Sequence, residues 1–114
     1  MNTTEIVNRL ESLPKKAWDA FKVLSEVKKE YEALKNQKET TLAFYSMKYE
    51  GSEASIKRQA LADPGYKEHI NALNRAQGEY ITAQARVNAV ETELACLQSI
   101  VKITTAELKL TSIT

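Results

Sequence analysis

Glycine and proline are scarce in this sequence, which has three glycines and two prolines among 114 residues. Both residues interrupt helices, and strand-rich folds with many tight turns normally use more of them. Their scarcity therefore favours long uninterrupted helices over a strand-rich fold. Because the three glycines are also scattered along the chain, the sequence contains no glycine-rich phosphate-binding loop.

The side chains that most often build metal and nucleophilic sites are equally few. Cys96 is the only cysteine, so it has no partner for an internal disulfide, which fits a reducing compartment. His69 is the only histidine, and on one helix it would lie about 40 Å from Cys96, too far to share a metal or nucleophilic site. We therefore expect His69 on a helix surface, Cys96 in a core, no cofactor and no enzymatic activity.

Neither an excess of charge nor a long apolar run is present. The sequence has 16 basic and 15 acidic side chains, so its net charge of +1 gives no bulk attraction for nucleic acid. No apolar run approaches the roughly 18 residues that span a bilayer, and the first residues contain no hydrophobic signal core. We expect a cytoplasmic protein that makes no membrane contact.

A long helical pattern is what the sequence does contain. From Asp63 to about Leu110, apolar residues recur at alternating steps of three and four with one gap at Thr104, the seven-residue repeat of a helix packed along its length. Such a helix would be about 65–70 Å long, whereas a compact domain of this size has a radius of gyration of about 13 Å. The rest of the chain cannot surround such a helix, so the helix must bury its stripe of apolar residues in an elongated hairpin, in an oligomer, or in both.

Caps and breakers set the expected ends of the helices. Ser12-Leu13-Pro14 is predicted to separate two helices, because Ser is a good cap and Pro suits a first turn. Gly51 is predicted to end the second helix, Ser52 to cap the third and Asp63 to cap the fourth. The expected helices span 4–11, 14–49, 53–62 and 64–110 of a single domain. The expected fold class is all-α, an elongated antiparallel helical hairpin with short accessory helices, assembling into a helical oligomer.

The oligomer is predicted from the end of the last helix. Its apolar residues have no evident partner within the chain, and the stripes of the two long helices exceed what one hairpin can cover. The predicted contact residues are Leu94, Leu97, Ile100, Val101 and Ile103.

Aromatic and basic side chains gather around the turn between positions 44 and 58. Rings on which any base can stack, together with a few cations, are what sequence-independent binding of single-stranded nucleic acid needs. The candidate DNA-binding residues are Lys38, Tyr45, Lys48, Tyr49, Lys57 and Arg58, with Phe44 beside them. The alternative is that the rings close the end of the hairpin as a small core, and the pattern alone favours that interpretation. A further basic track lies among acidic residues, which indicates ordinary pairing on an exposed helix face; it consists of Lys15, Lys22 and Lys29.

The order of these features resembles the UvsY-type recombination mediators of tailed phages. The matching residues are Lys28-Lys29-Glu30, Gln37-Lys38, Leu42, Tyr49 and Gly51, followed by the spacing from Asp63 through Tyr80 into the terminal helix. The resemblance implies a small helical protein that assembles into rings, binds single-stranded DNA, displaces the single-strand-binding protein and loads the recombinase. Where that family would have a basic pair after Leu42, this chain has Ala43-Phe44-Tyr45. The cations left for phosphate contacts are Lys38, Lys48, Lys57 and Arg58.

Two functions of different classes follow. The first is a non-catalytic, single-stranded-DNA-binding recombination mediator, with a recombinase and a single-strand-binding protein as partners. The alternative is a helical oligomeric adapter, or a phage assembly or structural protein, that binds no nucleic acid. An inhibitor of an enzyme would show the same sequence pattern as that alternative.

Overall fold

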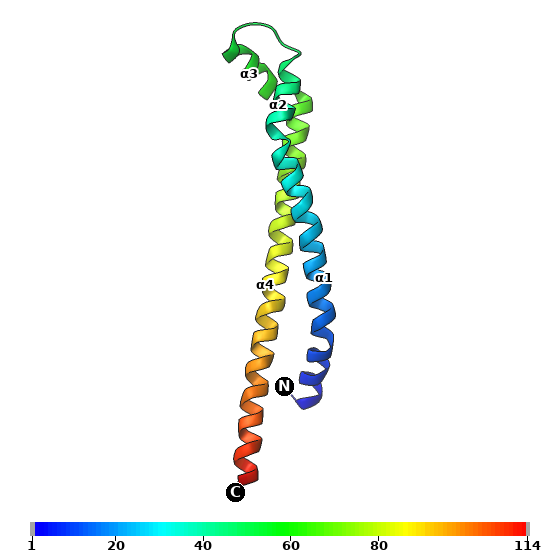
Figure 1. The fold of residues 1–114 in the computed structure, drawn as a ribbon, viewed down its shortest axis with the longest axis vertical. Helices are drawn as coiled ribbons and strands as arrows, with labels where there is room; N and C mark the ends of the chain where they lie inside the picture. The colour runs from blue at the N-terminus through cyan, green and yellow to red at the C-terminus, as the bar shows by residue number, and fades with distance from the viewer. Residues whose placement is uncertain (1, 114) are drawn as a thin grey trace. The chain divides into compact units, whose positions relative to one another are not determined.

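Residues 2–113 are described by a computed structural model, which places the side chains of residues 2–110. The helices are α1 (Thr3–Asn36), α2 (Lys38–Ser46), α3 (Glu53–Leu61) and α4 (Pro64–Ile113), as Figure 1 shows. Residues 2–113 contain no strand, so the predicted all-α class is confirmed. None of the described helices is both long enough and apolar enough to cross a membrane.

The chain divides into two compact units. Unit 1 comprises Met1–Leu24 and Ala83–Thr114, and unit 2 comprises Ser25–Thr82. Within unit 1, α1 and α4 run side by side in opposite directions (Figure 1), and Lys16 Nζ lies 3.9 Å from a carboxylate oxygen of Glu93. Within unit 2 the same two helices are also antiparallel, since the ring of Tyr31 stacks on that of Tyr80 while Leu34 meets His69.

The predicted stripe of α4 forms the core of each unit. Its buried members are Tyr66 and Ala76 in unit 2 and Ala83, Val87 and Leu97 in unit 1. The other buried apolar residues are Leu13 and Ala20 of α1 in unit 1 and Ala60 of α3 in unit 2. Past Leu97 the same stripe is exposed, at 38% for Val101 and 65% for Leu108. The seven-residue pattern therefore identifies the core-facing side of α4 as far as Leu97.

The helix break predicted at Ser12-Leu13-Pro14 is wrong, because α1 continues through Pro14. A proline inside a helix costs about 3 kcal/mol, since it lacks an N–H and crowds the carbonyl four residues earlier. Against this, Leu13 is only 3% exposed, and burying one leucine side chain contributes about 1.5–3 kcal/mol. Ala20, two turns further along the same face, is buried as well. Packing of this face against α4 therefore offsets the local penalty.

The predicted helix from 14 to 49 is also corrected, because α1 ends at Asn36 and α2 spans only Lys38–Ser46. At the interruption, Nε2 of His69 lies 3.2 Å from the carbonyl oxygen of Leu34. In an unbroken helix that carbonyl accepts a hydrogen bond from the N–H of Lys38. A side chain that inserts into the hydrogen-bond ladder is a known cause of a helix break. The predicted surface histidine is instead half-buried and contacts the interruption.

Two of the predicted helix caps are confirmed. The Ser52 hydroxyl accepts a hydrogen bond from the N–H of Ser55 at 3.2 Å, at the start of α3. Asp63 Oδ1 accepts one from the N–H of Gly65 at 2.8 Å, at the start of α4. Gly51 has a φ of +130°, which L side chains rarely adopt, so the turn between α2 and α3 requires a glycine there.

Candidate nucleic-acid interface

Asp63 is the centre of a polar cluster in unit 2. Its side chain is buried, with the residue only 4% exposed. While Oδ1 accepts the hydrogen bond from Gly65, Oδ2 accepts one from the Tyr49 hydroxyl at 2.5 Å. Lys48 Nζ lies 3.6 Å from Oδ2. Because both oxygens of the buried carboxylate have partners, Asp63 ties the segment after α2 to the first turn of α4.

These contacts also set the protonation states of the cluster. The hydrogen bond from Tyr49 lowers the pKa of Asp63 below its ordinary value, and the Gly65 N–H and the charge of Lys48 act in the same direction against the effect of desolvation. The same hydrogen bond, together with burial and the negative charge of Asp63, raises the pKa of Tyr49. At neutral pH the pair is therefore an ionised carboxylate and a neutral phenol.

Tyr45 packs against the start of α4. A methyl group placed on Gly65 would overlap the far edge of the Tyr45 ring, at Cε1, Cζ and the hydroxyl oxygen. Lys48 Nζ lies 4.9 Å from the centroid of the same ring, and Phe44 meets it edge-on at 5.2 Å between centroids. Tyr45 and Tyr49 are both half-buried. These contacts fit the alternative interpretation of the sequence, in which the two tyrosine rings form a small core and do not stack on bases.

Phe44 differs from the two tyrosines, because it is 61% exposed. Met47, one turn later, is 83% exposed, and Lys48 follows directly in the chain. Sequence reasoning placed Phe44 beside the candidate residues but not among them. The signal that distinguishes it is its position next to Tyr45 on a helix, where adjacent side chains point about 100° apart and so differ in their distance from the core.

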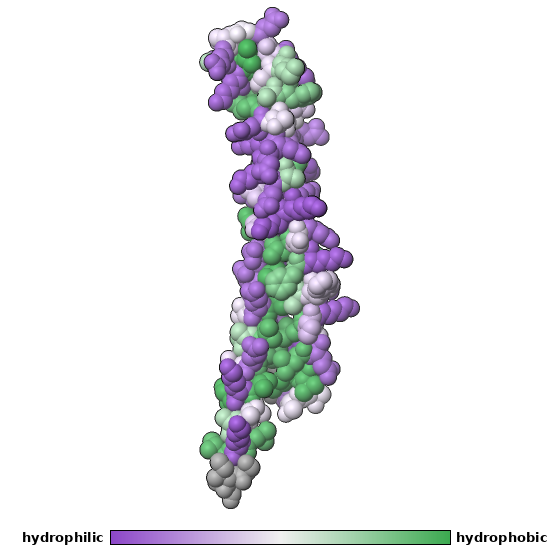
Figure 2. Space-filling view, in the orientation of Figure 1, coloured by the Kyte–Doolittle hydropathy of each residue, from purple (hydrophilic) through white to green (hydrophobic). Residues whose placement is uncertain are grey.

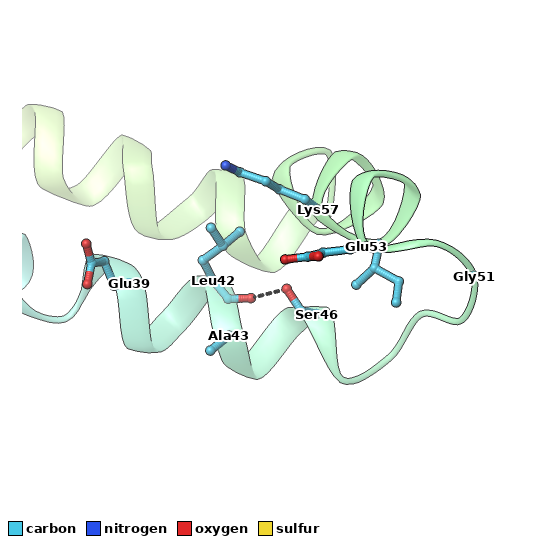
Figure 3. A pocket seen from close by; sticks show the side chains of 8 residues that line it. Glu39, Leu42, Ala43, Ser46, Gly51, Glu53 and Lys57 are labelled. Atoms are coloured by element: carbon cyan, nitrogen blue, oxygen red, sulfur yellow. Dashed lines mark hydrogen bonds between the residues drawn. The ribbon is translucent and has the colours of Figure 1, made fainter.

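The predicted cations lie at separate places in unit 2. Lys57 lines an open groove of about 660 Å³ between α2 and α3, shown in Figure 3. Two carboxylates share that groove with it, those of Glu39 and Glu53. Arg58 is exposed on α3, and Lys38 lines a second groove, between the α1–α2 junction and α4. Of the six predicted DNA-binding residues, the structure brings together Tyr45, Lys48 and Tyr49 around Asp63 and leaves the other three on other surfaces.

The second groove was not found from the sequence. It has a volume of about 530 Å³ and is lined by Tyr31, Lys35, Asn36, Lys38, Glu39, Leu73, Asn74 and Gln77. Tyr31 and Tyr80 stack beside it with centroids 5.6 Å apart and planes 20° apart. In the sequence both tyrosines fit the apolar stripes, and only the pairing of α1 with α4 shows that their rings meet.

The predicted oligomer contacts differ in their accessibility. Leu97 is 2% exposed inside unit 1, and Ile100 is half-buried. The accessible members are Leu94 (39%), Val101 (38%) and Ile103 (59%). Leu94 and Val101 are seven residues apart and share a face, while Ile103 lies about 200° around the helix from Val101. Cys96, predicted as a core residue, is exposed.

Helix α1 adds apolar surface to unit 1 that the sequence did not single out. Trp18 is 70% exposed, Phe21 47% and Val7 43%. A small apolar crevice of about 130 Å³ joins this side of α1 to Leu94; its other lining residues are Leu10, Leu13, Pro14, Ala17 and Val90. Figure 2 shows hydrophobic atoms gathered where the blue part of α1 and the yellow-to-orange part of α4 lie in Figure 1. Unit 1 therefore carries an exposed apolar face built from both helices.

Comparisons with known protein families, with curated proteins and with solved structures found no match for this chain. In the part of the chain that the structure describes, no group of three or more His, Cys, Asp or Glu side chains could hold a metal ion.

Proposed function

We propose that the protein is a non-catalytic, homo-oligomeric recombination mediator, which binds single-stranded DNA and helps to load a recombinase onto DNA coated with single-strand-binding protein. The observation that supports it best is the exposed ring of Phe44 at the end of α2, beside Tyr45 and Lys48. An accessible ring next to a cation suits a stacked base and its phosphate. The resemblance to the UvsY-type mediators points to the same activity.

The phosphate contacts in this proposal come from Lys38, Lys48, Lys57 and Arg58, all of which are exposed. Tyr45 and Tyr49 support the surface from beneath through their contacts with Gly65 and Asp63. Phe44 takes over the stacking role that the sequence suggested for them. Assembly occurs through the apolar face of unit 1, so that a few phosphate contacts in each subunit are multiplied within the oligomer.

The decisive experiment is binding to a labelled thymidine 30-mer at about 50 and 150 mM salt. We expect binding that weakens with salt, and Phe44→Ala should reduce affinity by about 5- to 150-fold, the range for loss of one stacked base. Met47→Ala, which removes a neighbouring exposed side chain without a ring, is the matched control. The mediator activity is then measured as recombinase filament formation on DNA already covered by single-strand-binding protein. Absence of binding at about 50 mM salt would refute the proposal.

The second candidate is a helical oligomeric adapter or phage assembly protein without nucleic-acid binding. The charge of unit 2 favours it, because that unit has nine basic and nine acidic side chains and no net positive charge. The apolar face of unit 1 suits either function. An oligomer in light scattering that binds no oligonucleotide would support the adapter.

A further inference from the structure

The groove at the junction of α1 and α2 has the chemistry of a nucleotide site. It lies within unit 2, where α1 gives way to α2 and both face α4. Its volume of about 530 Å³ lies within the range of about 300–1,000 Å³ for small-ligand sites.

An aromatic wall is the first element of this site. Tyr31 lines the groove, and its ring is braced by the stacked ring of Tyr80. Lys35 Nζ lies 5.9 Å from the centroid of the Tyr31 ring. A ring fixed by a second ring is a pre-ordered platform, since little side-chain freedom remains to be lost when a base stacks on it.

Apart from Leu73, the rest of the lining is polar. Among the described residues, Lys35 and Lys38 form no ion pair. The side-chain amides that line the groove also make no hydrogen bond within the described part of the chain; they belong to Asn36, Asn74 and Gln77. Amides can pair with the edges of a base, and ammonium groups can pair with its phosphates. Glu39 is the one carboxylate in the lining.

We propose that this groove binds one nucleotide unit of single-stranded DNA, with the base against Tyr31 and the flanking phosphates near Lys35 and Lys38. The inference rests on the proposed function and adds a second contact to the one at Phe44. An acidic peptide would use the two lysines but would need neither the ring nor the amides. A neutral sugar would use the ring and the amides and leave both ammonium groups without a counter-charge.

The phosphate contacts are tested with paired charge variants. Lys35→Gln with Lys38→Gln removes two cations from the groove, and Lys28→Gln with Lys29→Gln removes two exposed cations outside its lining. Binding of a labelled thymidine 30-mer is measured by anisotropy from about 50 to 200 mM salt. The groove pair should lower the log–log salt slope by up to about 1.4, at about 0.7 for each phosphate contact, while the control pair leaves the slope unchanged. Since Lys38 is already a phosphate contact of the proposed function, Lys35→Gln alone gives the share that is specific to the groove, a fall of about 0.7. Glu39→Gln should strengthen binding, because it removes the one carboxylate of the groove.

The base contact is tested with an abasic strand of the same length. Tyr31→Leu should weaken binding of the thymidine strand by about 5- to 150-fold and leave binding of the abasic strand unchanged. Tyr31→Trp keeps a ring on Tyr80 and should retain the binding of the wild type. Because Tyr31 packs on Tyr80, circular dichroism melting accompanies each variant, and the exposed lysine pair tests the groove without disturbing that packing.

The outcomes separate the two proposals. If the wild-type protein does not bind the thymidine strand, both the mediator function and the groove site fail. If it binds, but the groove lysine pair and the control pair have equal slopes, the groove site is refuted together with the phosphate contact assigned to Lys38, and the mediator function stands on its other contacts. If Tyr31→Leu weakens the abasic strand as much as the thymidine strand, the assignment of a base to Tyr31 is refuted.

Discussion

Replacing Gly65 by Ala tests the packing that closes the end of unit 2. In a helix, Ala is more favourable than Gly by about 0.5–1 kcal/mol. At Gly65, however, the new methyl group would overlap the ring of Tyr45. Overpacking of this kind costs about 1–3 kcal/mol, so after the gain from Ala the free energy of unfolding should fall by up to about 2.5 kcal/mol. Moving the ring aside would also break its contact with Lys48, which adds to the cost.

Gly78→Ala is the matched control, because it makes the same change in the same helix. A methyl group at Gly78 would meet no heavy atom within 4 Å beyond its chain neighbours and the backbone of its own helix, so this variant should gain about 0.5–1 kcal/mol. The assay is urea unfolding followed by circular dichroism, at one protein concentration because oligomerisation shifts apparent stability. In a Tyr45→Ala background, Gly65→Ala should become stabilising like the control. Equal stabilisation by the two alanines in the wild-type background would refute the packing of Tyr45 on Gly65.

Four further perturbations address the buried carboxylate, its tyrosine partner, the internal proline and the apolar face. Because the pKa of Asp63 is lowered on folding, its ionised carboxylate stabilises the fold at pH values above the unfolded pKa. This stabilisation is lost as the pH falls through the folded pKa. Urea unfolding measured between pH 2 and 6 should show this loss, and the pH dependence should be smaller in Asp63→Asn. The raised pKa of Tyr49 predicts a second loss of stability as the pH rises above about 10, which should be absent in Tyr49→Phe. Pro14→Ala should stabilise the protein by up to about 3 kcal/mol in urea unfolding, and a loss would mean that the proline ring itself is needed in the crevice. Leu94→Asp should lower the mass of the oligomer measured by light scattering. Ile103→Asp, on the other side of α4, should leave that mass unchanged. Equal effects of the two variants would place the oligomer interface elsewhere.

Local and periodic signals in the sequence determined much of the fold. The seven-residue repeat identified the core side of α4, because only a helix with a partner along its length keeps apolar residues in that register. The caps at Ser52 and Asp63 were also readable, since each pairs with an N–H two or three residues away. These features depend on neighbours within one or two helical turns, which a single sequence contains in full.

The candidate surfaces were predictable only in part, because they also depend on contacts between residues that are far apart in the sequence. The sequence indicated that aromatic and basic residues gather between positions 44 and 58, and the structure keeps them in unit 2. Which of the rings is accessible depends on α4, because Gly65 leaves the space that Tyr45 occupies and Asp63 binds the Tyr49 hydroxyl. Phe44 is left exposed by that arrangement.

The tertiary structure decided the features that join distant segments. Pro14 reads locally as a helix start, but burial of the face that carries Leu13 keeps α1 continuous. The interruption at Gln37 has no local glycine or proline to mark it, and His69, 35 positions away from Leu34, supplies the contact at that point. The groove beside Tyr31 likewise exists because α4 brings Tyr80, Asn74 and Gln77 to it. Each of these depends on burial or hydrogen bonding between residues far apart in the chain, and such interactions outweigh local preferences of about 1–3 kcal/mol.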